Sequence, residues 1–184
     1  LPTGVDLAEY LPRRSTGYLH RELNLPANSR CATIIGQIGL RKGTDVALQA
    51  VQQIVAEFPE LHLLIVGERT SNKDESRQFE ATLHAMAIES SLAGHVHFLG
   101  NRTDVPALLT ECDLLVHAAR QEPLGLGLLE AAASGMAIVA TDVGGTREIF
   151  PPDAHAAAYT PHDAPVHVAD TVVSMLGDVR DITM

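Results

Sequence analysis

The sequence predicts an α/β fold, a Rossmann-like doubly wound parallel sheet with helices on both faces, and three observations lead to this prediction. A length of 184 residues is typical of one domain,. Hydrophobic residues make up 46% of the chain and charged residues 20%, which allows a sizeable core. Apolar, β-branched runs alternate with segments of helical period, a pattern that indicates βαβ units. We therefore expect a single domain over residues 1–184.

The first strands and the helix between them are predicted by their hydrophobic patterns. "CATIIGQI" (Cys31–Ile38) and "LHLLIVG" (Leu61–Gly67) are apolar runs rich in β-branched residues and leucine, as buried strands are,. "TDVALQAVQQIVAEF" (Thr44–Phe58) has apolar residues at helical spacing, which predicts an amphipathic helix,. The order strand, helix, strand places the two strands in one βαβ unit.

The same scheme continues to the end of the chain. A helix is expected over Asp74–Glu89, opened by a capping box of Asn72 and Glu75,. The segment 151–165, rich in proline, is interpreted as a surface connection. The remaining predicted elements are strands at His95–Gly100, Asp113–Ala118 and Ala137–Thr141, and helices near Val105–Glu111, Gly125–Ser134 and Val166–Leu176.

Composition argues against several classes of protein. A net charge of -10, 4% aromatic residues and the absence of tryptophan argue against a nucleic-acid partner, which needs a basic surface and often stacking platforms,. No apolar run approaches the roughly 18 residues of a membrane helix. Cys31 and Cys112 each stand alone in an apolar run, which predicts buried thiols and a reducing, cytoplasmic location,.

We expect no metal site. We also expect that the chain is part of a longer protein. His95 and His97 would share one face of a strand, but no third ligand stands at a helpful spacing,. There is also no Asp-x-Asp pair to hold a divalent ion on a diphosphate. The chain opens on "LPTGVD" without Met, so we expect that its natural N-terminal partner sequence has been removed.

The loop after the first strand is a candidate phosphate site. Ligands of doubly wound sheets bind beyond the carboxyl ends of the strands. "GQIGLRKG" (Gly36–Gly43) follows the first strand and places Arg41 and Lys42 at the entrance of a helix. Two cations and free helix amides suit a phosphate group. The alternative is a pair of solvated charges on a surface loop.

The segment "RQEPLGLGLLEAAASG" carries two carboxylates in an apolar setting, so each needs a hydrogen-bonding partner,. We place Glu122 on a loop, begin the helix near Gly125 or Leu126, and place Glu130 in its second turn,. Both carboxylates can then converge beside the amides of Gly125 and Gly127. Such a site suits a ligand with hydroxyls next to phosphates. The alternative is that Glu130 pairs internally, with Arg147 or Lys42.

Two other loops lie at the same edge of the predicted sheet as the candidate site. Gly144 and Gly145 form a turn after the strand at residues 137–141, and Asn101 and Arg102 follow the strand at residues 95–100.

"GLGLLE" resembles the dinucleotide fingerprint Gly-x-Gly-x-x-Gly, but Glu130 occupies the third glycine position, where close packing excludes a long side chain,. We therefore do not expect an NAD-type oxidoreductase.

These residues resemble the C-terminal, donor-binding domain of retaining GT-B glycosyltransferases, in particular glycosyltransferase family 4 (glycosyl transferases group 1). The family signature is Glu, seven residues, Glu, as in Glu122 and Glu130. "EPLGLGLLEAAASGMAIVATDVGGTREI" corresponds to the strongest block of the family, and "TGVD" (Thr3–Asp6) to its Asn-Gly-Val-Asp. "LLIVGE" and "FLGNRTDVPALL" fall where the family places its second and third strand loops, so the resemblance covers nearly the whole chain.

The resemblance implies roles for these residues. Glu130 would accept hydrogen bonds from the ribose hydroxyls, and Glu122 would contact the transferred sugar or support the donor phosphates. Lys42 would neutralise the diphosphate leaving group during metal-independent transfer with retention at the anomeric carbon. The other implied donor-binding residues are Gly39, Gly67, Asn101 and Arg102, with the last two facing the base, and Gly125, Leu126 and Gly127, whose amides would hold sugar and diphosphate.

One position departs from the family pattern. The family usually has Arg directly after the glycine of the first strand, and this chain has Gln37 there. We expect Arg41 to substitute in part, because it lies beside Lys42 on the same loop. Thr3 in place of the family's Asn is a smaller departure.

The resemblance also implies partners. The donor would be a UDP-, GDP- or ADP-sugar, with no other cofactor. An N-terminal domain of the same full-length protein would bind the acceptor, so we expect this chain alone to bind donor without robust transfer. We expect a cytoplasmic location, and the resemblance leaves open a peripheral association with the inner face of the membrane through that domain. Two other readings stay open, a non-catalytic nucleotide-sugar-binding or scaffold domain and a GT-B-type nucleotide-sugar epimerase.

Overall fold

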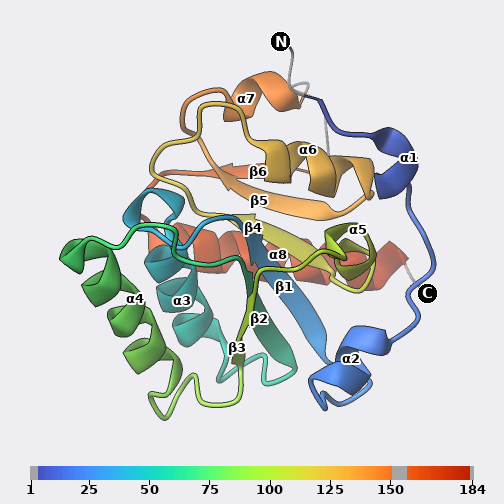
Figure 1. Cartoon of the computed structure of the whole chain (residues 1–184). Coiled ribbons are helices and arrows are strands. Elements are labelled where there is room, and N and C mark those ends of the chain that lie inside the picture. Colours follow the sequence, from blue (N-terminus) through green and yellow to red (C-terminus); the bar gives the residue numbers. More distant parts are fainter. Residues whose placement is uncertain (1–3, 151–156, 183–184) are drawn as a thin grey trace.

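A six-stranded sheet organises the chain (Figure 1). The computed structural model describes residues 4–150 and 157–182. Thr3 and the first part of the predicted connection, residues 151–156, lie outside the described residues. The strands run parallel in the order β3-β2-β1-β4-β5-β6. They are β1 (Arg30–Ile35), β2 (Leu61–Val66), β3 (Val96–Gly100), β4 (Leu114–His117), β5 (Ala137–Thr141) and β6 (Ala157–Thr160).

Helices cover both faces of this sheet, because the strands bury side chains in both directions. Successive residues of a strand point to opposite faces. Thus Ala32 and Ile34 pack with α3, α4 and α8, whereas Cys31 packs on the other face with residues of α2 and α5. The helices are α1 (Leu7–Tyr10), α2 (Tyr18–Glu22), α3 (Thr44–Ile54), α4 (Asp74–Ala87), α5 (Val105–Leu109), α6 (Leu126–Ala133), α7 (Thr146–Ile149) and α8 (Pro165–Ile182), with a 3-10 turn η1 (Leu40–Lys42).

The predicted fold class is confirmed, and the five predicted strands are found, β5 with the predicted bounds and the other four with shifted ends. The first strand ends at Ile35 rather than Ile38, because the chain turns at Gly36, whose φ is +139°. The prediction that residues 151–165 form only a surface connection is wrong. Residues 157–160 form β6, which pairs in parallel with β5 at the edge of the sheet. Four residues flanked by prolines carry too short a pattern to be recognised as a strand.

Two further details, both concerning helices, differ from the prediction. The capping box is wrong: Lys73 is the N-cap of α4 and makes no side-chain cap, whereas the Asn72 side chain accepts a hydrogen bond from Arg69. The short helices α1 and α2 were not predicted, because one turn of helix has no clear period. In the described parts of the chain, no helix is both long and apolar enough to span a membrane.

Two close backbone approaches hold the loops at the carboxyl end of the sheet together. A Cβ on Gly43 would lie 1.8 Å from the carbonyl oxygen of Ala118, and a Cβ on Gly67 would lie 2.0 Å from that of Gly36. Both glycines have positive φ, +65° and +131°. Any larger residue at either position would clash with these carbonyl oxygens. Glycine therefore lets the loop after β1 lie against the loops after β4 and β2.

Candidate functional site

A cavity of about 300 Å³ lies at the point where the strand order reverses, between β1 and β4. Doubly wound sheets bind their ligands at this switch point, outside the carboxyl ends of the strands. The lining comes from the loop after β1 on one side and from the loop after β4 and the start of α6 on the other. Its residues are Ile35, Gly36, Gln37, Lys42, Glu122, Leu124, Gly125, Leu126, Gly127 and Glu130.

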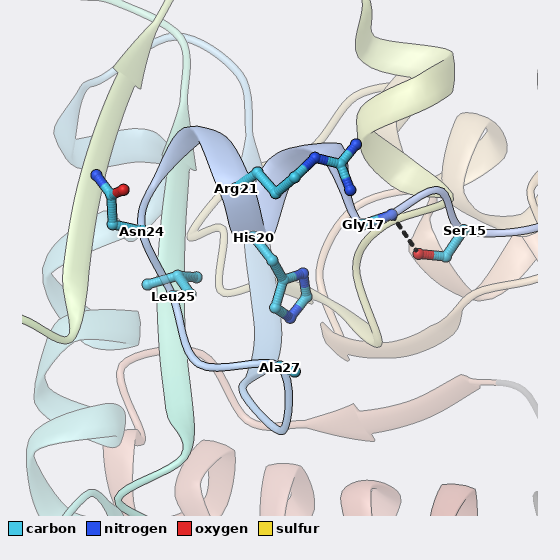
Figure 2. A pocket seen from close by; sticks show the side chains of 7 residues that line it. All are labelled: Ser15, Gly17, His20, Arg21, Asn24, Leu25 and Ala27. Atoms are coloured by element: carbon cyan, nitrogen blue, oxygen red, sulfur yellow. Dashed lines mark hydrogen bonds between the residues drawn. The ribbon is translucent and has the colours of Figure 1, made fainter.

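A larger cavity, of about 620 Å³, lies at the opposite end of β1, beside α2 (Figure 2). Figure 2 shows the His20, Arg21 and Asn24 side chains pointing in different directions rather than toward one ligand position. Arg21 donates a hydrogen bond to the carbonyl of Thr16, at 2.9 Å. Convergent polar groups mark a binding site better than volume does, so the cavity at the switch point is the candidate.

Glu122 is the most thoroughly hydrogen-bonded group in the candidate site. Its Oε2 accepts from Lys42 Nζ at 2.6 Å and lies 2.9 Å from His117 Nε2. Its Oε1 accepts from the amide of Gly125 at 2.9 Å, in the turn that precedes α6. The side chain is 7% exposed. These hydrogen bonds, led by that from His117, hold the pKa of Glu122 well below its usual range although burial opposes this,.

The contact with Glu122 fixes the tautomer of His117. A carboxylate with a low pKa only accepts hydrogen bonds, so Nε2 of His117 must carry the proton,. Among the residues that the structure describes, none offers a hydrogen-bonding partner to His117 Nδ1, which is buried. His117 is the last residue of β4, and it therefore orients Glu122 from the end of a rigid strand.

Lys42 enters the cavity from the last position of η1. Its side chain passes over the backbone of Gly36, where a Cβ would lie 3.3 Å from Lys42 Cε. The ammonium group has three donors. One is directed to Glu122, and the side chain keeps 22% exposure, so Lys42 can still donate to a ligand in the cavity.

Arg120 connects the two loops that carry Lys42 and Glu122. Its guanidinium donates to both carboxylate oxygens of Asp45, at 2.9 and 2.8 Å, and to the carbonyl of Leu40, at 2.7 Å. Its backbone amide donates to the carbonyl of Arg41, at 2.9 Å. A bidentate pair with added backbone contacts holds η1 against the loop after β4.

Glu130 lines the cavity from the second turn of α6, and its partner is a residue that the sequence did not suggest. The predicted alternative, a pair with Arg147 or Lys42, is not found: Arg147 pairs with Asp142 at 2.7 Å and Lys42 with Glu122. Instead the Tyr10 hydroxyl is the neighbouring group that acts on the pKa of the Glu130 carboxyl group. Burial raises the pKa of Glu130, and the hydrogen bond from Tyr10 lowers it in part.

The structure brings most of the predicted donor site together. Gln37, Lys42, Glu122 and Glu130 line one cavity, and so do Gly125, Leu126 and Gly127. Helix α6 begins at Leu126, as predicted. Gly125 precedes it with φ +69°, a conformation that favours glycine,. Gly127 faces open space, because a Cβ there would come no closer than 3.8 Å to another group, the carbonyl of Ile35.

The other predicted site residues lie outside the cavity wall. Arg41 is exposed on η1, and Gly39 precedes that turn. Asn101 donates to Glu68 at 3.0 Å, and Arg102 is held by Glu22 and Asp104. Gly67 lies at the end of β2 and serves the backbone approach described above.

Sequence reasoning missed three residues of this site. His117 and Arg120 lie in the predicted strand and loop ahead of Glu122, but only the fold shows that His117 reaches Glu122 and Arg120 reaches Asp45. Tyr10 stands 120 positions before Glu130, and nothing local links them. Within the described residues, no group of three histidines, cysteines or acidic residues could hold a metal ion.

Comparison with known proteins identifies a matching family and several similar proteins. The sequence profile of the family described as "Glycosyl transferases group 1" matches residues 18–178. The chain is 31% identical over 183 residues to the phosphatidyl-myo-inositol mannosyltransferase of Mycolicibacterium smegmatis, covering 97% of this chain and 42% of that relative. It is 28% identical over 156 residues to spore coat protein SA of Bacillus subtilis, covering 80% of this chain and 41% of the relative. The chain thus spans about two-fifths of the length of these curated relatives.

Two solved structures share the fold. The complex of Anabaena HepE with UDP-glucose superposes with a TM-score of 0.86 and 24% identity, over 96% of this chain and 47% of HepE. The C-terminal domain of LpcC, a glycosyl transferase group 1 family protein of Francisella tularensis, superposes with a TM-score of 0.82 and 24% identity, over 96% and 90% of the two chains. These likenesses show the Rossmann-like fold of GT-B proteins.

Proposed function

The chain belongs to the glycosyl transferases group 1 family, and we propose that it is the domain of a glycosyltransferase that binds a nucleoside diphosphate sugar. The observation that carries the proposal is the cavity at the switch point, where Lys42, Glu122 and Glu130 meet the N-terminus of α6. An ammonium group and free helix amides suit a diphosphate, and carboxylates suit hydroxyls. Structures of the same fold hold UDP or UDP-glucose, which supports this choice of ligand.

The diphosphate would lie between Lys42 and the start of α6. The first amides of a helix have no acceptor within it, so those of Leu126 and Gly127 are available to phosphate and sugar. Both oxygens of Glu122 are engaged by protein donors. Of its two expected roles, contact with the sugar or support of the phosphate site, this pattern favours support. Gln37 would contact the diphosphate from the opposite wall.

The nucleoside would lie toward Glu130, whose carboxylate accepts from the ribose hydroxyls. Asn101 and Arg102 would face the base from the loop after β3, beyond the cavity wall. Arg41 would act on the diphosphate at longer range, because it is exposed beside Lys42. Gly39 and Gly67 would contribute by shaping the two loops that border the donor.

We further propose metal-independent transfer with retention at the anomeric carbon. Negative charge develops on the diphosphate as it departs, and Lys42 with the N-terminus of α6 would stabilise it there. Glu122 keeps Lys42 in place for this step and is itself held by His117. The donor sugar would be consumed in the reaction, with no other cofactor.

The rest of the reaction would belong to an N-terminal domain of the same full-length protein. This chain spans about two-fifths of its curated relatives, so we propose that the acceptor binds outside it. The chain alone would bind donor and transfer sugar poorly. We propose a cytoplasmic location, with peripheral association with the inner membrane face through the N-terminal domain when the acceptor is a lipid.

A thermal-shift panel with UDP, GDP, ADP and their sugar conjugates tests the proposal. A ligand at about 100 times its dissociation constant adds about 2.7 kcal/mol of stability, which raises the Tm by about 5 to 10 °C. We expect one nucleotide to give this shift and Glu130→Ala to abolish most of it. A chain that responds to none of these nucleotides contradicts the proposal.

A further inference from the structure

The N-terminal segment, which includes α1, places the Tyr10 side chain beside the helix that carries Glu130. Tyr10 is the last residue of α1, which packs beside α6 (Figure 1). Its ring packs against the apolar cluster that includes Leu128 and Ala131 of α6. Its hydroxyl lies near the Glu130 carboxylate on the same helix, and the negative charge of Glu130 helps to raise the pKa of Tyr10. The ring and the hydroxyl thus contact α6 at once.

The segment is held at the other end of α6 as well. Gly135, in the turn that follows that helix, has φ +74°, and a Cβ there would lie 3.3 Å from Pro12. Tyr10 therefore lies against α6, and Pro12 lies against the turn that follows it. The family profile begins at residue 18, so this contact is made by residues outside the matched region.

A carboxylate at the position of Glu130 needs such a contact. Glu130 is half-buried on a helix whose neighbouring residues are apolar, and an unpaired charge there is costly,. A carboxylate has about four acceptor positions, so a hydrogen bond donated by Tyr10 would leave the others for a ligand. A single donor from the side of α1 also restricts the rotation of the carboxylate. Preorganisation of this kind increases affinity because less conformational freedom is lost on binding.

We propose that Tyr10 is a positioning residue that orients the Glu130 carboxylate toward the ribose hydroxyls of a bound nucleoside diphosphate. The inference rests on the proposed function, because it needs a ribose in the cavity. It assigns part of the selectivity of the site for ribose to the segment before the matched family region. Tyr10 itself does not contact the ligand.

The test compares nucleotides with and without ribose hydroxyls. Calorimetry measures the Kd of UDP, GDP and ADP and of their 2′,3′-dideoxy counterparts for the chain and for Tyr10→Phe. The wild-type chain should prefer its ribonucleotide by about 10 to 100-fold, as expected for hydrogen bonds to a charged group. Tyr10→Phe should weaken the ribonucleotide by about 3 to 10-fold and leave the dideoxy analogue within about twofold.

Tyr18→Phe is the matched control. Tyr18 also donates its hydroxyl to a carboxylate, that of Asp104 at 2.8 Å, but it lies on α2 and not in the cavity wall. This variant should leave the ratio of the two affinities unchanged, because Asp104 holds Arg102, which would face the base that both forms share. In a Glu130→Gln background, Tyr10→Phe should cause no further loss, because the two residues act in series.

The outcomes separate this inference from the proposed function. A wild-type chain that binds no nucleoside diphosphate overturns both. A wild-type chain that binds ribose and dideoxy forms equally overturns the role of Glu130 and with it that of Tyr10. If the wild-type chain prefers the ribonucleotide and Tyr10→Phe prefers it by the same factor, the donor site stands and Tyr10 does not position Glu130. The same conclusion follows if Tyr10→Phe weakens both forms equally.

Discussion

Lys42 Nζ lies 2.6 Å from Glu122 Oε2 and forms an ion pair across the switch point of the sheet. Lys42 follows β1, and Glu122 follows β4. The pair therefore joins the two loops between which a doubly wound fold binds its ligand. It also neutralises a carboxylate that is 7% exposed. Glu122 is thus a partner that holds a cation in the cavity rather than a free base.

Replacing Lys42 should affect both stability and binding. Lys42→Met leaves the buried Glu122 carboxylate without its cation, and we expect a loss of about 2 kcal/mol in the free energy of unfolding. Loss of a charge-assisted contact to the diphosphate should weaken nucleoside diphosphate binding by about tenfold or more. Denaturant titration and calorimetry measure the two effects. Lys73→Met, at the exposed N-cap of α4, is the control and should change neither. Unchanged affinity in Lys42→Met would remove Lys42 from the site.

Arg41 should contribute differently from Lys42, because it is exposed. An exposed charge acts through solvent, and salt screens it over about 8 to 10 Å at physiological ionic strength. Arg41→Ala should therefore weaken nucleoside diphosphate binding by about two to threefold at low salt and by less at 0.5 M salt. Calorimetry at the two salt concentrations checks this. If Arg41→Ala leaves affinity unchanged at low salt while Lys42→Ala reduces it, Arg41 does not compensate for Gln37.

Gly144 should be needed for the position of Glu122. A Cβ at residue 144 would lie 2.2 Å from the carbonyl oxygen of Glu122, and φ is +55°. Gly144→Ala must shift the loop that carries Glu122, so we expect about 1 to 3 kcal/mol of destabilisation and weaker nucleotide binding. Gly177→Ala is the control, because a Cβ there meets nothing within 4 Å on α8. It should stabilise the chain by about 0.5 to 1 kcal/mol. A Gly144→Ala variant of wild-type stability and affinity would show that this turn adapts freely.

Stability should fall in mild acid because of a histidine cluster at the amino ends of β2 and β3. His62 Nδ1 lies 3.1 Å from His97 Nε2, and His95 stacks on His62. Burial, with a smaller effect of His97 and His95, lowers the pKa of His62 from 6.5 to about 4. The unfolded chain therefore binds this proton more readily, and stability present above pH 6.5 is lost as the pH falls toward 4.

The expected loss between pH 7 and pH 5 is about 1 to 2 kcal/mol. Denaturant titration at the two pH values measures it. His62→Gln should show a shallower pH dependence than the wild-type chain, whereas His162→Gln, at an exposed turn, should follow the wild type. A wild-type chain equally stable at both pH values would mean that the cluster accepts protons without cost.

The hydrophobic pattern by itself determined the sheet and its helices. Runs such as Leu61–Val66 are buried along their whole length, so their composition already carries the fold,. The spacing of Glu122 and Glu130 around Gly125 and Gly127 also determined that one loop and one helix would face a single cavity, since a helix start orients its first turns. β6 and α1 could not be predicted, because a segment of four residues is too short to show a hydrophobic period.

Only the tertiary structure decided which group each charge meets. From the sequence alone, Glu130 could pair with Arg147 or Lys42. In the structure the partner of Glu130 is Tyr10, and Lys42 pairs with Glu122. The physical reason is range. Periodicity and turn chemistry act over a few residues, but a hydrogen bond between residues 80 or 120 positions apart depends on how strands β1 and β4 and helices α1 and α6 are packed.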